Sequence, residues 1–378
     1  MGARSLFVSL LVAAACGDST PDEVDASMDA LVDALADASV DVGNEDAAAI
    51  DAAPSCTPFE TAAPIPVSLG PCARTLAREE LPTETRNEDG VEIRANIPFA
   101  TRGDYVLHGD LHLPEAREGT GAIVIIHGGG WLDCDNRRTE VSGFAQGIAS
   151  VLGVPAFNID YRLAQEGGGY PNNVMDVKCA LQWLRQESEA LGIDADRIGV
   201  LGTSAGAHLA LMAALTSDRA DLDPACADAP TDVSLALAYA PPTDLPRFVT
   251  SDSLANEAPR FYTGETCDDP VRCLSGRGCT RCVDASPLAH ACRPKETRVV
   301  LLQAPDPYDR LVAQIQSEVL ADALRDAGTP VDLRIPSDAE MRAAGCTPEG
   351  GSHAADGCMI RASQDLVNPL LLEFLGPR

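Results

Sequence analysis

Apolar residues in the middle of the chain gather in short runs that alternate with longer amphipathic stretches. Residues 122–126 are continuously apolar, as expected for a strand buried on both faces. Residues 174–191 carry apolar side chains at helical spacing, which predicts an amphipathic helix. A further predicted strand, residues 197–201, leads through a turn of small residues into an apolar helix over residues 207–215. This alternation of strand and helix predicts a parallel sheet.

The same rhythm continues on both sides of this region. It predicts helices over 141–152, 315–327 and 363–375, and strands over 155–161, 233–240, 298–303 and 331–335. Upstream, residues 91–98 and 105–114 alternate between apolar and polar positions, which predicts antiparallel strands leading into the sheet. The predicted fold class is α/β, with a mainly parallel, doubly wound sheet and helices on both faces. Residues 244–293 break the rhythm, and we expect them to form a Cys-rich insertion over the carboxyl edge of the sheet.

The first 55 residues have a different character. Residues 1–16 combine one positive charge, a short apolar core and three alanines before Cys16, which is typical of a secretory signal. The apolar run is too short to span a bilayer as a mature helix. Residues 17–55 are dominated by Asp, Glu and Ala and contain no Lys, Arg or aromatic residue, which predicts a disordered acidic linker. The folded domain is therefore expected over residues 56–378.

Charge and cysteine content narrow the classes of partner. The chain of 378 residues carries 57 acidic and 28 basic side chains, a net charge of -29, so nucleic acid is not an expected partner. Removing Cys16 from the thirteen cysteines leaves an even number, which suits complete pairing in an oxidising compartment. The Cys279-x-x-Cys282 spacing is compatible with a zinc site, but in an exported chain it favours disulfides. We expect no metal and no cofactor.

The turn Gly202-Thr203-Ser204-Ala205-Gly206 fits the pattern Gly-x-Ser-x-Gly between a predicted strand and a predicted helix. A serine at such a turn is held at strained backbone angles, and the flanking glycines let two backbones pass closely. The following helix directs its first N–H groups toward developing negative charge. Ser204 is therefore a candidate nucleophile, although small-residue turns of this kind also occur for purely structural reasons.

A glycine loop follows the predicted strand at residues 122–126. It reads His127-Gly128-Gly129-Gly130-Trp131. Consecutive glycines let backbone N–H groups point into a cavity without obstruction, which acyl transfer needs when a carbonyl oxygen becomes an oxyanion. We expect His127 to fix this loop rather than to transfer a proton. The pairing of this loop with Gly-x-Ser-x-Gly is much more specific for acyl transfer than either motif alone.

Together with Asp160-Tyr161-Arg162-Leu163 and the segment over residues 284–290, these motifs resemble the α/β-hydrolase superfamily. Within it, the chain is similar to the esterase/lipase branch related to hormone-sensitive lipase and to bacterial feruloyl and acetyl esterases. The resemblance covers roughly residues 105–375 and implies an α/β-hydrolase fold. It also implies an oxyanion hole made by the backbone N–H groups of Gly129, Gly130 and Ala205.

The resemblance further implies a triad in the order serine, acid, histidine. Of the three histidines after Ser204, His353 follows the last predicted strand and precedes the closing helix, where the base of this family lies. The acid is expected after the strand over 298–303. Counting back from the helix that opens with Gln316-Ser317 places Asp309 there, with Asp306 as the alternative, and the usual His-Gly of the family is absent. The acid would orient the imidazole and stabilise its charged form.

On this resemblance, the chain is a serine hydrolase that cleaves carboxylic esters, with small acyl groups on alcohols or carbohydrate as expected substrates. The motifs do not separate esters from amides, so a peptidase or amidase on the same fold is an alternative. A surface binding protein on a hydrolase scaffold without catalysis is a second alternative.

The N-terminal signal also bears on the location of the protein. Ala13-Ala14-Ala15-Cys16 resembles a bacterial lipobox, without its usual Leu. The resemblance implies that Cys16 carries the lipid, and Gly17 after it implies an outer-membrane anchor in the cell envelope. An ordinary cleaved signal, which makes the protein secreted, is the alternative.

Overall fold

The computed structural model describes most of the chain after residue 75. The described residues are 76–133, 137–248, 258–260, 262–264, 280–348 and 357–377. The predicted signal over 1–16 with its Cys16, the predicted linker over 17–55 and the candidate base His353 lie outside these ranges.

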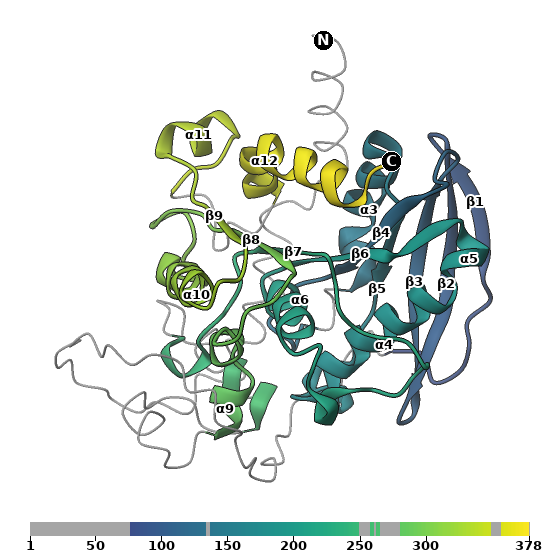
Figure 1. Ribbon diagram of the computed structural model, residues 1–378, viewed down its shortest axis with the longest axis horizontal. Helices are drawn as coiled ribbons and strands as arrows, with labels where there is room; N and C mark the ends of the chain where they lie inside the picture. Colours follow the sequence, from purple (N-terminus) through teal and green to yellow (C-terminus); the bar gives the residue numbers. More distant parts are fainter. Residues whose placement is uncertain are drawn as a thin grey trace, which may run out of the picture.

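A nine-stranded sheet forms the centre of the protein (Figure 1). Its strands are β1 (Glu84–Glu88), β2 (Val91–Arg102), β3 (Tyr105–Pro114), β4 (Thr120–Ile126), β5 (Ala156–Ile159), β6 (Ile193–Thr203), β7 (Leu235–Tyr239), β8 (Arg298–Leu302) and β9 (Val331–Arg334). They lie in the order β1-β2-β3-β5-β4-β6-β7-β8-β9. β1, β2 and β3 pair antiparallel with their neighbours, and all pairs from β5 to β9 are parallel. The predicted α/β class with a mainly parallel sheet is confirmed.

Helices cover both faces of the sheet (Figure 1). α4 (Asn172–Gln186), α6 (Ala205–Leu215) and α10 (Gln314–Asp326) pack on one face, and α3 (Ser142–Gly147) and α12 (Gly357–Leu375) pack on the other. The shorter helices are α5 (Ser188–Leu191), α9 (Thr280–Asp284), α11 (Asp338–Ala343) and the π-helical turn η2 (Ile148–Leu152). Single 3-10 turns are η1 (Arg138–Val141), η3 (Ala164–Glu166), η4 (Ala220–Leu222), η5 (Leu245–Arg247) and η6 (Pro287–His290). Among the described residues, no helix combines the length and apolar character that a membrane crossing requires.

β4 shows how the apolar runs build two cores. All seven of its residues are buried. Because successive side chains of a strand point to opposite faces, Val124 and Ile126 join the core beneath α4 and α6, whereas Ile123 and Ile125 join the core beneath α3 and α12. A strand buried on both faces has no polar alternation, which is why its sequence is continuously apolar.

Some elements were not expected from the sequence, among them β1 and α11. All five side chains of β1 are exposed, so the strand has no apolar pattern and is held by its pairing with β2. α11 is only six residues long and buries Met341 alone. Two predicted helices are also divided: residues 141–152 form α3 and η2, and the long helix over 174–191 breaks at Glu187 between α4 and α5.

A disulfide joins Cys179 of α4 to Cys226, 47 residues further along the chain, with the two Cα atoms 5.3 Å apart. Cys282, Cys292 and Cys346 are also disulfide-bonded. For Cys282, this bears out the expectation of a disulfide rather than a zinc ligand. The segment between Cys179 and Cys226 contains β6 and α6, the strand and helix that flank Ser204.

Lys178 lies next to this disulfide and is completely buried. Its ammonium donates a hydrogen bond to the carbonyl oxygen of Thr216 at 2.6 Å. Burial, with a contribution from nearby Arg219, lowers the pKa of Lys178 to about 8. The folded protein therefore binds this proton less tightly than the unfolded chain does.

We predict that Lys178 makes the free energy of unfolding rise with pH above 8. Between pH 8 and the ordinary pKa of lysine, the unfolded chain binds more protons, so stability increases as pH rises. Relative to Lys178→Met, the wild type should gain about 2–3 kcal/mol between pH 7 and pH 10. Urea unfolding of both proteins at the two pH values measures this difference, and equal pH dependence in the two proteins would contradict it.

Candidate active site

The turn between β6 and α6 brings Ser204 to the carboxyl edge of the sheet. Ser204 has φ 53° and ψ -122°, a conformation that costs a non-glycine residue on the order of 1–3 kcal/mol. Hydrogen bonds hold it on both sides: its N–H donates to the carbonyl of Tyr239 in β7 at 2.8 Å, and its carbonyl accepts from the N–H of His208 at 3.0 Å. Ser204 remains half-buried, so the strained turn leaves it at the surface of an otherwise buried element.

The two glycines around Ser204 are required by close backbone contacts. A Cβ atom on Gly202 would lie 2.2 Å from the carbonyl of Gly206, and one on Gly206 would lie 2.3 Å from the carbonyl oxygen of Ile126 and 2.4 Å from that of His127. Real Cβ atoms do not approach backbone this closely. The start of α6 therefore touches the end of β4, and the close passage of backbones predicted from the flanking glycines is observed.

The glycine loop lies directly against the nucleophile turn. A Cβ atom on Gly128 would lie 3.5 Å from the Cβ of Ser204. After Gly128 the backbone turns with φ 94° at Gly129 and 54° at Gly130, and the carbonyl of Gly129 accepts hydrogen bonds from two following N–H groups. Ala205 is the first residue of α6. The structure thus brings Ser204, Ala205 and the glycine loop together at one corner of the sheet.

His127 and Tyr161 fix the peptide that precedes Gly129. Nδ1 of His127 lies 2.9 Å from the carbonyl oxygen of Gly128, and the hydroxyl of Tyr161 donates to the same oxygen at 3.1 Å and to that of His127 at 3.2 Å. Burial lowers the pKa of His127 to about 4, so the ring is neutral at pH 7, and this contact makes Nδ1 the donor. Because a peptide is planar, holding the Gly128 carbonyl also sets the direction of the Gly129 N–H. Sequence reasoning had given Tyr161 no role, although it lies in one of the matching motifs.

Two arginines after the glycine loop are engaged in ion pairs. Arg138 pairs with the carboxylates of Asp110 and Asp160, and Arg137 pairs with Glu166 at 2.7 Å. All of these side chains are largely buried. Removing one partner of a buried ion pair leaves the charge of the other partner uncompensated. Their role in the structure is to hold the segment that follows the loop.

Burial separates the two candidate acids after β8. Asp309 is only 4% exposed, and its Oδ1 accepts hydrogen bonds from the N–H groups of Leu311 and Val312, both at 2.9 Å. Asp306 is exposed, and its Oδ1 accepts a hydrogen bond from the N–H of Gln314 at 3.5 Å. The loop that carries both lies at the same edge of the sheet as Ser204, with β7 between β6 and β8.

Gln303 holds the loop that carries Asp309, a loop in which the family's usual His-Gly is absent. The side chain is fully buried at the end of β8. Its Nε2 donates to the carbonyl of Val312 at 2.9 Å, and its Oε1 accepts from the hydroxyl of Ser317 at 3.0 Å. Gln303 therefore ties the far end of the loop to β8 and to α10. Sequence reasoning missed this residue, and the only available signal was a polar amide at the end of an apolar strand.

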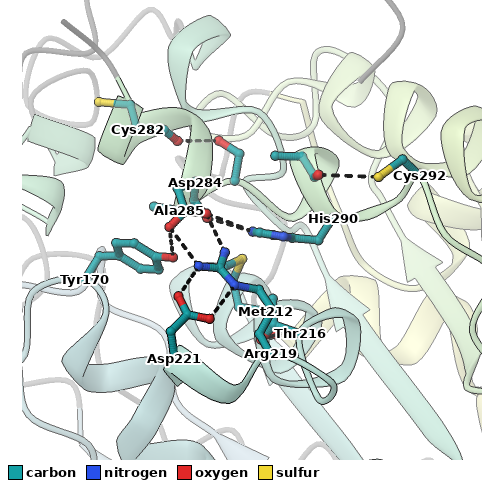
Figure 2. A network of polar contacts seen from close by, with 12 residues as sticks. Tyr170, Met212, Thr216, Arg219, Asp221, Cys282, Asp284, Ala285, His290 and Cys292 are labelled. Atoms are coloured by element: carbon teal, nitrogen blue, oxygen red, sulfur yellow. Dashed lines mark hydrogen bonds and ion pairs between the residues drawn. The ribbon is translucent and has the colours of Figure 1, made fainter. Parts of the chain in front are cut away.

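The two described histidines that follow Ser204 are engaged in backbone contacts. His208 is fully buried and its Nε2 donates to the carbonyl of Ala285 at 2.7 Å, while burial lowers its pKa to about 3. Nε2 of His290 donates to the carbonyl of Asp284 at 2.7 Å, within the polar network around Arg219 (Figure 2). Both have structural roles. The candidate base His353 lies outside the described residues.

Within the described ranges, no group of three or more His, Cys, Asp or Glu side chains is arranged to hold a metal ion. The described residues that pack against the turn at Ser204 are those of the glycine loop, whose backbone Tyr161 and His127 hold. Chemically, this arrangement places the hydroxyl-bearing turn against the glycine loop.

Comparison with known proteins identifies a family and several similar proteins. The BD-FAE family model matches residues 109–324, which is more than half of the chain. Esterase LipQ of Mycobacterium tuberculosis is 28% identical over 236 residues, which cover 62% of this chain and 53% of LipQ. Ethyl acetate hydrolase of Pseudomonas putida is 33% identical over 125 residues, which cover 32% of this chain and 38% of that enzyme. The chain thus spans about half or less of the length of these relatives.

Solved esterase structures share the fold. A truncated form of a carbohydrate esterase from gut microbiota has a TM-score of 0.59 at 19% identity, covering 77% of this chain and 99% of that one. The apo form of Thermogutta terrifontis esterase 2 has a TM-score of 0.56 at 21% identity, covering 76% of this chain and 97% of that one. The α/β-hydrolase fold expected from the sequence is confirmed.

We predict that Gln303→Leu destabilises the protein through its loop contacts. The substitution leaves the Val312 carbonyl and the Ser317 hydroxyl without their buried partner, which should lower the free energy of unfolding by about 2–4 kcal/mol. Denaturant unfolding measures this change.

Ser317→Ala provides the control in a double-mutant cycle. Because the hydroxyl of Ser317 bonds to Gln303, Ser317→Ala should cost less in the Gln303→Leu background than in the wild type. Strictly additive effects would contradict the assignment of Gln303 as the residue that ties the loop to α10.

Proposed function

Because the chain belongs to the BD-FAE family, we propose that it is a serine hydrolase that cleaves carboxylic esters. The observation that supports this most strongly is the contact between the strained turn at Ser204 and the glycine loop. A hydroxyl in this position has backbone N–H groups beside it, where charge develops during attack on an ester carbonyl. The esterase names of the relatives agree with this reaction.

In the proposed mechanism, the hydroxyl oxygen of Ser204 attacks the ester carbonyl carbon while His353 takes its proton. The carbonyl oxygen becomes an oxyanion that accepts hydrogen bonds from the N–H groups of Gly129, Gly130 and Ala205. The tetrahedral intermediate expels the alcohol, which receives the proton from His353, and an acyl-enzyme remains. Water then attacks the acyl-enzyme with His353 as base, which releases the carboxylic acid and restores Ser204.

Asp309 is the proposed acid of the triad. It is buried, and its Oδ1 is held by two backbone N–H groups, so its carboxylate has one orientation. A fixed carboxylate orients the imidazole and stabilises its charged form. The exposed Asp306 lacks these features.

The proposed substrates are esters of small acyl groups. The relative from Pseudomonas putida is named for ethyl acetate, a small acyl ester. The resemblance of the motifs to bacterial feruloyl and acetyl esterases extends the proposal to acyl groups on carbohydrate.

Turnover of p-nitrophenyl acetate by three variants tests the proposed triad. Ser204→Ala should lower kcat/KM by roughly four to six orders of magnitude, and Asp309→Asn by about 10²- to 10⁴-fold. Asp306→Asn, the matched control in the same loop, should change it less than about threefold, because that carboxylate is exposed. A large loss in Asp306→Asn with little loss in Asp309→Asn would reverse the assignment of the acid.

Labelling with a fluorophosphonate separates the nucleophile from the rest of the proposal. The wild type should be labelled and Ser204→Ala should not. A wild type that is neither labelled nor active on the ester would overturn the esterase proposal. Faster turnover of aminoacyl anilides than of p-nitrophenyl acetate would instead favour an amidase.

We also propose that the protein is exported and anchored to a membrane through lipid on Cys16. The proposal rests on the lipobox-like Ala13-Ala14-Ala15-Cys16 and on the disulfides, which form in oxidising compartments. In a host that processes lipoproteins, labelled palmitate should enter the wild type and not Cys16→Ser. A wild type that takes up no label would support an ordinary cleaved signal and a secreted protein.

A further inference from the structure

The backbone stays left-handed for one residue beyond the glycines of the loop. Trp131 has φ 63°, directly after Gly129 and Gly130 with positive φ of their own. This conformation is natural for glycine but costs about 1 kcal/mol or more for a bulky residue, so contacts elsewhere must hold it.

Trp131 lies in a buried cluster of three rings, here called the aromatic cluster, made of Trp131, His208 and Tyr262. The rings of Trp131 and Tyr262 stack with centroids 4.5 Å apart and planes inclined by 13°. The ring of His208 packs edge-on against both, at 5.0 Å from Trp131 and 5.2 Å from Tyr262. None of the three is more than 1% exposed. Each aromatic pair contributes roughly 0.5–1.5 kcal/mol beyond burial of area, which is enough to offset the strain at Trp131.

The three rings come from three separate parts of the chain. Trp131 belongs to the glycine loop, His208 to α6, and Tyr262 to the Cys-rich insertion. The insertion also reaches the loop through Ala258, whose Cβ would lie 4.0 Å from a Cβ placed on Gly130. These two described residues of the insertion therefore pack directly onto the loop that precedes the nucleophile in sequence.

Tyr262 is itself held from the opposite side. Its carbonyl accepts a hydrogen bond from the N–H of Tyr170 at 2.9 Å, and the next carbonyl, that of Thr263, accepts from Nε of Arg281 at 2.7 Å. The hydroxyl of Tyr170 donates to the buried carboxylate of Asp284 at 2.6 Å, and Arg219 pairs with the same carboxylate (Figure 2). Tyr262 thus has a fixed backbone from which its ring supports Trp131.

We propose that Tyr262 is a positioning residue for ester hydrolysis: its ring holds Trp131, and thereby keeps the backbone N–H groups of Gly129 and Gly130 directed toward the oxyanion. The assignment rests on the proposed function, in which these two N–H groups are oxyanion donors. A displaced donor weakens stabilisation of the transition state more than binding of the substrate. Loss of the ring therefore lowers kcat and leaves KM nearly unchanged.

The hydroxyl of Tyr262 takes no part in this role. It is buried, and no hydrogen-bond partner for it occurs among the residues that the structure describes. The ring supplies the stacking surface, and Phe presents the same surface without a buried polar atom. Tyr262→Phe therefore removes the hydroxyl and keeps the ring, so that the roles of the two groups can be tested separately.

Steady-state kinetics on p-nitrophenyl acetate for three variants tests the proposal. Tyr262→Leu should lower kcat roughly 10- to 100-fold with KM changed less than about threefold. Tyr262→Phe should keep kcat within about twofold of the wild type. Phe157→Leu is the matched control, because it removes a fully buried ring that packs on Phe99 and Trp183 in the core beneath α4, and it should lower the Tm without lowering kcat.

Trp131→Phe covers the case in which Tyr262→Leu fails to fold, because it retains a smaller ring in the stack and should lower kcat about 3- to 10-fold. Wild-type kcat in a folded Tyr262→Leu, or in Trp131→Phe when the former does not fold, would overturn the positioning role. A loss of kcat in Tyr262→Phe as large as in Tyr262→Leu would also overturn it, because the hydroxyl would then be the active group. A wild type without ester turnover overturns the proposed function and this assignment together, whereas these variant results overturn the assignment alone.

Discussion

The contact between the start of α6 and the end of β4 is the constraint on which the rest of the site depends. At Gly206 there is no room for even a Cβ atom, because the carbonyl oxygens of Ile126 and His127 occupy that space. The turn at Ser204 and the glycine loop after β4 are therefore parts of one rigid unit. Groups that stabilise charge in a transition state are most effective when their arrangement is set before the substrate arrives. Here, folding itself sets the distance between the proposed nucleophile and the proposed donors.

Around this unit, each loop is held by a buried polar or aromatic contact from a distant part of the chain. Tyr161 holds the Gly128 carbonyl, Gln303 holds the loop of Asp309, and Tyr262 packs on Trp131. These side chains share one property, which is that they act on backbone conformation and not on a reacting atom. Loops positioned by a rigid scaffold are where function concentrates, and the scaffold here extends into the insertion.

The fold was largely predictable because the buried strands leave a strong signal. A strand covered on both faces, such as β4, must be continuously apolar, and the Gly-x-Ser-x-Gly turn follows from a backbone contact that excludes side chains. β1 left no signal, since its five side chains are all exposed and its hydrogen bonds go to β2. Pairing of that kind is decided by the neighbouring strand and not by local composition.

The residues that hold the loops of the site, such as Gln303 and Tyr262, were harder to predict because their contacts are not local in the sequence. The amide of Gln303 contacts Val312 and Ser317, and the ring of Tyr262 contacts Trp131 from more than a hundred residues away. Neither contact has a fixed spacing in the sequence, so no local pattern marks it. Asp309 could be proposed by counting along the chain, but its burial and its two backbone donors became evident only in the structure.

The disulfide between Cys179 and Cys226 encloses the turn that carries Ser204. Residues 180–225, with β6, Ser204 and α6 among them, form a covalently closed ring within the chain. In the chain-entropy model, closing a loop of this length removes conformational freedom from the unfolded ring worth about 4 kcal/mol. The redox state of the compartment in which the chain folds therefore acts directly on the part that bears Ser204. With these thiols reduced, the same sequence would fold without this stabilisation of the part that carries Ser204.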